Sequence, residues 1–273
     1  MHRRENTVET DSGLWRYSIT GDASETVLVL PGALGTRAAL PLVDALCLTF
    51  RVVCVSYGNA TTMRETTAAL ARILDAEKIR RTHVVGASYG SVIAQFLAFH
   101  EPSRVGGVAL VHGFRVSPAD AWRFRLAMGL GRVMPPRLMR WLLRRRLERM
   151  VLNPIQAASH MDVARWKETV SELSAALLSG DAVILQQRCL HDAAMHWPEA
   201  VAFGTGFAQR LLIVDSDNDP VISPAARRAL VSAYPGATVK TFQGTGHLTS
   251  IVATEALAAT IREFLRALPP ICP

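Results

Sequence analysis

Short apolar runs alternate with longer amphipathic segments along most of this chain. The runs are rich in valine, leucine and isoleucine, and some are apolar at every position, as in Val27–Leu30. Uninterrupted apolar runs of this length are typical of strands buried on both faces, as in a parallel sheet. On this basis strands are predicted at residues 14–20, 26–30, 52–56, 82–86, 105–112, 211–215 and 238–243.

Apolar residues at helical spacing predict helices between these strands, at residues 61–78, 91–100, 224–234 and 254–268. Alternating strands and helices predict βαβ units, and so an α/β fold with helices on both faces of the sheet. The stretch from about Phe114 to Phe207 holds no convincing strand and is interrupted by several prolines. We therefore expect an α/β core domain from residues 1–114 and 208–273, with residues 115–207 inserted as a helical cap or lid.

Composition narrows the class of protein. The 273 residues are 49% hydrophobic, which suits one large core domain. The polar first residues hold no apolar segment typical of a secretory signal, and no apolar run reaches the length of a transmembrane helix. The four cysteines are scattered and include no CxxC pair, which argues against disulfides or a zinc site. A reducing, cytoplasmic setting is expected, with no metal or cofactor.

The charge is moderately positive, with 30 Lys and Arg against 23 Asp and Glu. Six of the arginines lie in the predicted cap segment Arg137–Arg149. The segment reads as a solvated helix face whose arginine stems cover apolar surface. The alternatives are a docking site for an acidic partner such as an acyl carrier protein, and a peripheral membrane contact. No nucleic-acid-binding motif accompanies the charge.

The segment Gly86-Ala87-Ser88-Tyr89-Gly90 follows a predicted strand directly and leads directly into a predicted helix. This is the G-x-S-x-G nucleophile elbow in the context that the motif requires. Ser88 must occupy a tight turn so that its hydroxyl projects from the sheet. The two glycines leave room where the backbones of the strand and the helix approach each other. The alternative is a chance match in an ordinary strand-to-helix turn.

An activated serine needs a base, and the base needs a group that orients it. In folds with this elbow the order is Ser, then Asp or Glu, then His. His247 follows the last predicted strand in a loop bounded by glycines. Three carboxylates lie at and just beyond the end of the strand at 211–215, in a segment called the acid loop below. Asp219 is favoured as the orienting acid, Asp217 is second and Asp215 is a third candidate.

The oxyanion hole of such a site uses backbone N–H groups. Tyr89, directly after the nucleophile, supplies one, and Ala33 in the glycine-containing loop after the strand at 26–30 is predicted to supply the other. Substrate contacts are predicted from Gly32, Leu34, His112 and, in the apolar cap, Trp122. Such a cap suits a hydrophobic acyl group, although ordinary packing between cap helices would also account for its apolar residues.

Together these segments resemble the α/β-hydrolase superfamily over nearly the whole chain. The matching residues are Leu30-Pro31-Gly32-Ala33, Gly86-Ala87-Ser88-Tyr89-Gly90, Asp219-Pro220-Val221 and Gly246-His247. Within the superfamily, the Leu-Pro-Gly segment and the Asp-rich acid loop are most similar to the maspardin-like group. The resemblance implies a mostly parallel eight-stranded sheet, a helical cap after the strand at 105–112, and a Ser88–Asp219–His247 triad.

Two positions depart from the superfamily's common pattern. Pro31-Gly32 stands where many members carry His-Gly, and Asp215-Ser216 begins an acid loop that often begins with glycine. Both departures leave the substrate class open. The expected activity is hydrolysis of an ester or thioester of a small hydrophobic acyl compound through an acyl-Ser88 intermediate. The alternatives are acyl transfer or cyclisation by the same triad, and a non-catalytic binding protein on a hydrolase scaffold.

Overall fold

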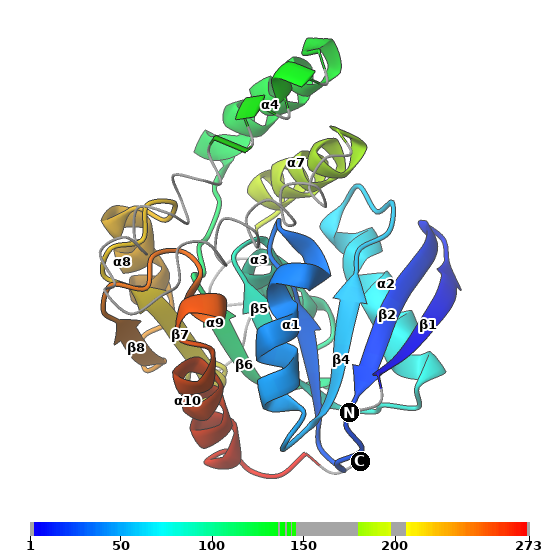
Figure 1. Cartoon of the computed structure of the whole chain (residues 1–273), viewed down its shortest axis with the longest axis vertical. Helices are drawn as coiled ribbons and strands as arrows, with labels where there is room; N and C mark the ends of the chain where they lie inside the picture. The colour runs from blue at the N-terminus through cyan, green and yellow to red at the C-terminus, as the bar shows by residue number, and fades with distance from the viewer. Residues whose placement is uncertain are drawn as a thin grey trace.

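A single sheet of eight strands forms the centre of the computed structural model, which describes residues 3–135, 137–139, 141–142, 144–145, 180–197 and 206–271 (Figure 1). Its order is β1-β2-β4-β3-β5-β6-β7-β8. β2 pairs antiparallel with β1 and β4, and all the other pairs are parallel. The strands are β1 (Arg3–Thr10), β2 (Gly13–Thr20), β3 (Thr26–Leu30), β4 (Arg51–Ser56), β5 (Thr82–Ala87), β6 (Val105–Val111), β7 (Leu211–Ser216) and β8 (Thr238–Phe242).

Helices cover both faces of the sheet, as the alternating pattern predicts (Figure 1). In β3, Val27 and Val29 pack on one face with α1 and α10, while Leu28 and Leu30 pack on the other with α2 and α3. This alternation explains why the strand is apolar at every position. The helices of the core are α1 (Gly35–Leu46), α2 (Met63–Ala76), α3 (Tyr89–His100), α8 (Pro224–Ala233), α9 (Thr249–Val252) and α10 (Thr254–Arg266).

Three elements of the core were not predicted, namely β1, α1 and the short helix α9. β1 is an edge strand whose residues are exposed or half-buried, so it lacks the apolar run that marks a central strand. Side chains anchor it instead: Arg4 and Asn6 both donate to the carboxylate of Glu77, at 2.8 and 2.9 Å. α1 begins at Gly35 and contains Pro41, and both residue types normally argue against a helix. Its buried apolar stripe overrides these preferences.

Helices are the regular elements of the described residues between β6 and β7, and no strand occurs among them. After a short 3₁₀ helix at Pro118–Asp120, α4 (Ala121–Val133) and α7 (Gly180–Met195) lie beyond one end of the sheet (Figure 1). The two helices contact each other, since a Cβ built on Gly131 of α4 would lie 3.3 Å from Ile184 of α7. The boundaries of the cap stay a prediction. Much of the arginine-rich segment 137–149 lies outside the described residues.

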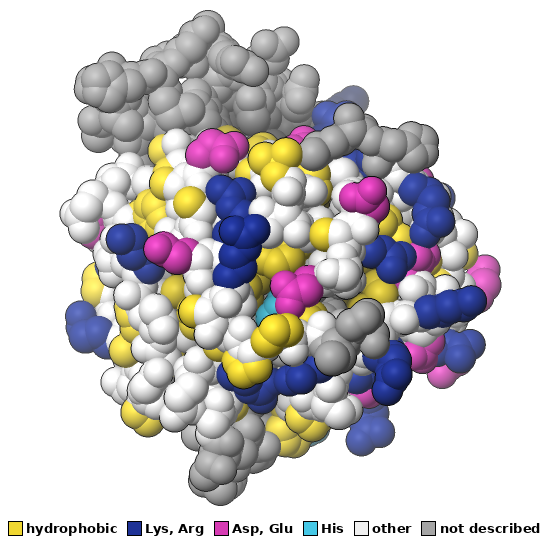
Figure 2. All heavy atoms as spheres, turned by 90° about the horizontal axis from the view of Figure 1, so that it is seen from below, with side chains coloured by type: hydrophobic (Ala, Val, Ile, Leu, Met, Phe, Trp, Pro, Cys, Tyr) yellow, Lys and Arg dark blue, Asp and Glu magenta, His cyan; other side chains and the backbone are white. Residues whose placement is uncertain are grey.

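The exposed side chains of the described core carry mixed charge. On the face shown in Figure 2, lysine and arginine side chains are interspersed with aspartate and glutamate. The net positive charge therefore does not gather into one patch on that face. Cys47, Cys54 and Cys189 are buried, as expected for Cys54. Among the described residues, no helix is both long and apolar enough to span a bilayer.

His83 is part of the core and not of the site. β5 and β6 change register between Thr82 and Val84, and there the N–H of Gly107 donates to His83 Nδ1 at 2.9 Å. The imidazole must be neutral at Nδ1 to accept this hydrogen bond. Burial, followed by the positive charge of Arg81, lowers the pKa of His83 from 6.5 to about 4.

The folded protein should therefore lose stability as the pH falls from 6.5 towards 4. In that range the unfolded chain binds a proton at His83 and the folded chain does not. Between pH 7 and pH 5 we expect this group to lower the free energy of unfolding by about 1–2 kcal/mol. Urea denaturation should show a weaker pH dependence in His83→Asn, whose side-chain oxygen can accept the Gly107 N–H without titrating. Equal pH dependence in the two proteins would contradict this assignment.

Candidate active site

Ser88 lies in the sharp turn between β5 and α3. Its φ of 49° and ψ of −113° form a strained conformation that residues other than glycine rarely adopt. A Cβ on Gly90 would lie 2.0 Å from the carbonyl oxygen of Leu30, and a Cβ on Gly86 would lie 2.4 Å from that of Gly90. Both glycines are therefore required by the close approach of the backbones, as the motif predicts.

Three side chains that are far apart in the sequence meet at this turn. His247 Nε2 lies 3.0 Å from Ser88 Oγ, and His247 Nδ1 lies 2.9 Å from Asp219 Oδ2. Nδ1 must carry the proton, because it faces a carboxylate oxygen. Nε2 is therefore free to accept the hydroxyl proton of Ser88. The structure thus brings together the serine, the histidine and the favoured carboxylate, in the arrangement that activates a serine.

Both carboxylate oxygens of Asp219 have contacts that fix the side chain. Oδ1 accepts the N–H groups of Val221 and Ile222, at 2.8 and 3.1 Å, while Oδ2 faces His247 and His112. Burial raises the pKa of Asp219, but its contacts with the two histidines outweigh burial and hold the pKa well below its usual value. The carboxylate therefore stays ionised at neutral pH.

The competing carboxylates of the acid loop lie elsewhere. Asp217 Oδ1 accepts the N–H of Gly244 at 2.8 Å, and the neighbouring Asn218 accepts that of Gly246 at the same distance. These two bonds tie the acid loop to the loop that carries His247. Asp215 is 9% exposed at the end of β7. The acid loop therefore supplies one orienting carboxylate and two side chains that hold the histidine loop in place.

The loop after β3 lies directly against the nucleophile. A Cβ on Gly32 would stand 3.3 Å from Cβ of Ser88, and the turn is closed by a hydrogen bond from the N–H of Gly35 to the oxygen of Gly32. Tyr57 holds this loop by donating its hydroxyl to the Pro31 oxygen at 2.8 Å. The N–H of Tyr89 is the first of α3 and has no acceptor within the helix. These features suit an oxyanion hole at Ala33 and Tyr89.

One face of α7 borders the same loop. Gln186 donates to the backbone oxygen of Ala33 at 3.4 Å, and Cys189 donates to that of Ala60 at 3.3 Å. One turn further on, Asp192 accepts the N–H of Met63 at 2.8 Å, at the start of α2. α7 is therefore attached to the core at three successive positions. It forms a fixed wall beside the oxyanion loop.

The predicted substrate contacts take different positions. Gly32 and Leu34 are half-buried in the loop beside Ser88. Trp122 is 61% exposed on α4, where the guanidinium of Arg123 lies over its ring. His112 is 3% exposed and lies against Asp219. The structure therefore places His112 behind the acid, a position that the sequence alone did not suggest.

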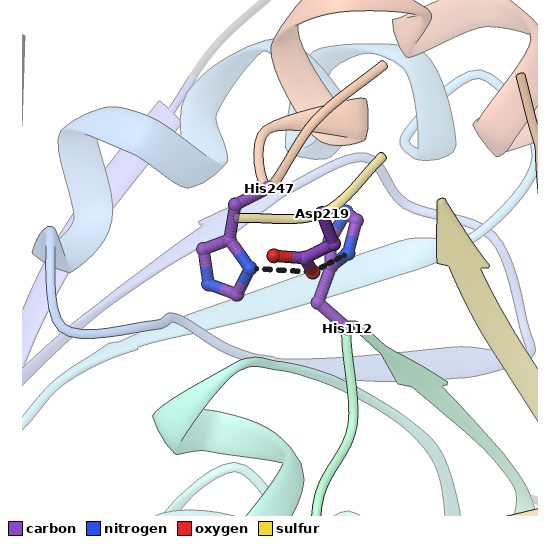
Figure 3. Close-up of side chains that lie close together, drawn as sticks. All are labelled: His112, Asp219 and His247. Atoms are coloured by element: carbon purple, nitrogen blue, oxygen red, sulfur yellow. Dashed lines mark hydrogen bonds and ion pairs between the residues drawn. The ribbon is translucent and has the colours of Figure 1, made fainter. Parts of the chain in front are cut away.

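The group formed by His112, Asp219 and His247 has ligand types that bind metals, with their nearest atoms within 4.8 Å of one another. The geometry favours hydrogen bonding instead. Both Nδ1 atoms lie within 3 Å of the same oxygen, Asp219 Oδ2, as Figure 3 shows. An ion placed among them would have to displace both protons from these contacts. The cluster is therefore better described as one carboxylate shared by two imidazoles.

Known proteins share the sequence pattern of this chain. Residues 27–260 match the family described as the alpha/beta hydrolase family. The chain belongs to this family. The matched range includes the turn at Ser88, the acid loop with Asp219 and the loop with His247.

Two relatives of this alpha/beta hydrolase carry names of activities. One is a dihydrolipoyllysine-residue acetyltransferase component of an acetoin cleaving system from Cupriavidus necator, 27% identical over 264 residues. The alignment covers 92% of this chain but 66% of that protein, so the chain spans just under two thirds of it. The other is the rhodomycin D methylesterase DauP from a Streptomyces species, 28% identical over 225 residues, which cover 74% of this chain and 72% of that protein.

Solved structures of other proteins share the fold. An enol-lactonase from Burkholderia xenovorans superposes with a TM-score of 0.76 at 19% identity, covering 96% of this chain and all of that one. A thermophilic esterase from Thermogutta terrifontis has the same TM-score at 18% identity, covering 97% of this chain and 98% of that one. At these identities the structural likeness shows the alpha/beta hydrolase fold and does not identify a substrate.

Proposed function

We propose that this alpha/beta hydrolase is a serine hydrolase that cleaves an ester or thioester of a small hydrophobic acyl compound. The observation that carries the proposal is the continuous chain of contacts from Ser88 Oγ through His247 to Asp219, with steps of 3.0 and 2.9 Å. A binding protein on the same scaffold would have no need of this alignment. The strained turn that exposes Ser88 supports the same conclusion.

Acylation begins at Ser88. As its Oγ attacks the carbonyl carbon of the substrate, His247 Nε2 takes the hydroxyl proton and Asp219 stabilises the imidazolium that results. The carbonyl oxygen becomes an oxyanion that can accept the N–H groups of Tyr89 and Ala33. The intermediate collapses when the carbon–oxygen or carbon–sulfur bond of the leaving group breaks. His247 returns its proton to the departing alcohol or thiol.

Deacylation repeats these steps with water. His247 removes a proton from the water as the water oxygen attacks the acyl-Ser88 ester, and the oxyanion forms again in the same place. When the bond to Ser88 Oγ breaks, His247 protonates the serine and the carboxylic acid leaves. His247 carries every proton transfer that this sequence needs, and Asp219 stabilises its cation throughout.

Ester chemistry is supported by the names of similar proteins, which include a methylesterase, an esterase and an enol-lactonase. Exposed apolar side chains on α4, among them Trp122, Leu126 and Leu130, support a hydrophobic acyl group. The free, buried thiols of Cys54 and Cys189 are compatible with a reducing, cytoplasmic setting.

Acyl transfer is the second candidate, favoured by the relative named as an acetyltransferase component. It would use the same acyl-Ser88 intermediate, with a second alcohol, thiol or amine replacing water. The two activities are separated by their products when a competing nucleophile is added in excess. Free acid as the main product favours hydrolysis.

The proposal is tested by labelling with a fluorophosphonate probe followed by intact mass analysis, and by turnover of p-nitrophenyl esters and acyl thioesters. The parent should gain one adduct and hydrolyse at least one ester, and Ser88→Ala should lose both. Ser103→Ala, at an exposed serine in the turn before β6, is the matched control and should behave as the parent does. A folded parent that neither labels nor turns over any ester would overturn the proposal.

A further inference from the structure

The acid of the candidate triad has a second histidine against it. His112 directly follows β6, with a φ of 50° and 3% exposure. Its Nδ1 lies 2.8 Å from Asp219 Oδ2, the oxygen that His247 also contacts. The rings of His112 and His247 are 4.8 Å apart between their centres, and Figure 3 shows the carboxylate between them. The proposed steps of catalysis do not use this second ring.

His112 is fixed on its other side by two hydroxyl groups. Its Nε2 lies 2.9 Å from Thr249 Oγ1, which in turn lies 2.7 Å from Thr245 Oγ1. All three side chains are buried. The backbone N–H of His112 donates to the oxygen of Val214 at 2.7 Å, which fixes the ring's origin relative to β7. A buried network in which each polar group has a partner holds the His112 ring in one orientation.

The contacts define where the protons are. A ring nitrogen 2.8 Å from a carboxylate oxygen is attracted to it when it carries a proton and repelled when it carries a lone pair, so Nδ1 of His112 is protonated. Burial lowers the pKa of His112, and this outweighs the opposing effect of Asp219, so the ring is neutral at pH 7. Nε2 therefore accepts the Thr249 hydroxyl proton, and Thr245 donates to Thr249.

The two histidines meet the shared oxygen differently. His247 Nδ1 forms a hydrogen bond to Asp219 Oδ2, whereas His112 Nδ1 lies 2.8 Å from the same oxygen without the geometry of a hydrogen bond. His112 therefore braces the carboxylate without competing for the straight approach that His247 uses. Asp215, the other carboxylate near the ring, comes from the end of β7 and favours the protonated form of His112.

We propose that His112 is a positioning residue, which holds Asp219 Oδ2 toward His247 and is itself held in one tautomer by Thr249 and Thr245. This inference rests on the proposed serine hydrolase function. In catalysis His247 becomes a cation, and a neutral neighbour 4.8 Å away stabilises the carboxylate without opposing that charge. Replacing the ring should therefore slow the chemical steps and leave substrate binding unchanged.

The test compares two matched pairs of variants. His112→Leu removes the ring's N–H, whereas His112→Asn keeps an N–H near the position of Nδ1 and tolerates the positive φ. Thr249→Val removes the hydroxyl, and Thr249→Ser keeps it. For each protein we would measure kcat and KM for a p-nitrophenyl ester between pH 5 and 9, the rate constant of fluorophosphonate labelling, and Tm.

We expect His112→Leu to lower kcat and the labelling rate about 10- to 100-fold with little change in KM, because the acid and base are misplaced. The midpoint of the acid limb of its kcat profile should also move to lower pH, since a carboxylate displaced from His247 stabilises the protonated ring less. His112→Asn should restore most of kcat and the parental profile. Thr249→Ser should match the parent, and Thr249→Val should fall between the parent and His112→Leu.

The outcomes separate this inference from the proposed function. An active parent with unchanged kcat and pH profiles in both His112→Leu and Thr249→Val would overturn the positioning role alone. Equal losses of Tm in His112→Leu and His112→Asn, with a parental pH profile in both, would show a merely structural role. Should His112→Leu fail to fold, Thr249→Val against Thr249→Ser decides the question. A parent that does not label overturns the proposed function and this inference with it.

Discussion

Replacing His247 by alanine is expected to lower kcat/KM for ester hydrolysis by about 10⁴-fold or more, since Ser88 then has no base to take its proton. The double variant Ser88→Ala/His247→Ala should be no slower than the slower of the two single variants, because the two side chains act as one unit. Steady-state kinetics on one p-nitrophenyl ester, with each protein checked by circular dichroism, would measure this.

His196→Ala is the matched control for that experiment. The side chain of His196, the residue directly after α7, is 71% exposed and contacts Asp192 at 3.0 Å. Its kcat/KM should stay within about twofold of the parent. If His247→Ala kept most of the parental activity, the triad would be wrong and the serine would have to be activated by another group.

Gly90→Ala is expected to destabilise the protein severely, by about 4 kcal/mol or more, or to prevent soluble expression. The added Cβ would lie 2.0 Å from the oxygen of Leu30 and 2.7 Å from that of Pro31, and neither backbone group can move without displacing β3. Soluble yield and urea denaturation would measure the effect.

The matched control is Gly129→Ala on α4, where a Cβ would meet nothing within 4 Å and the backbone is helical. This change should be neutral or stabilise the helix by about 0.5–1 kcal/mol. Parental stability in Gly90→Ala would mean that β3 and α3 are further apart than the structure places them.

The central strands could be predicted well from the sequence, because a strand that is buried on both faces is apolar at every position. Most of the amphipathic helices could be predicted from apolar residues at helical spacing. β1 could not, because an exposed edge strand is held by its ladder and by polar side chains that contact Glu77. α1 was hidden for a different reason. Pro41 and Gly35 oppose a helix locally, and only packing against α10 and the sheet stabilises it.

In the candidate site, too, local sequence patterns predicted some residues, while the positions of others depend on tertiary structure. Ser88 and His247 could be predicted because the elbow motif and the order of the loops are local features. The choice among Asp215, Asp217 and Asp219 depended on how one loop turns, which three nearby carboxylates do not reveal. His112 was expected to contact substrate. Its approach to Asp219 arises from pairing between β6 and β7, and that pairing brings together residues more than a hundred positions apart.

The backbone bonds at the strand ends bear on the order of folding. The N–H of Ser88 donates to Val111 and that of His112 donates to Val214, so the nucleophile and the second histidine take their places only when β5, β6 and β7 are aligned. β7 follows an insertion of about one hundred residues, and parallel pairing across so long a segment closes slowly. During refolding, reactivity at Ser88 should therefore appear after most of the helix has formed, which makes the fluorophosphonate adduct a reporter of the last stage of assembly.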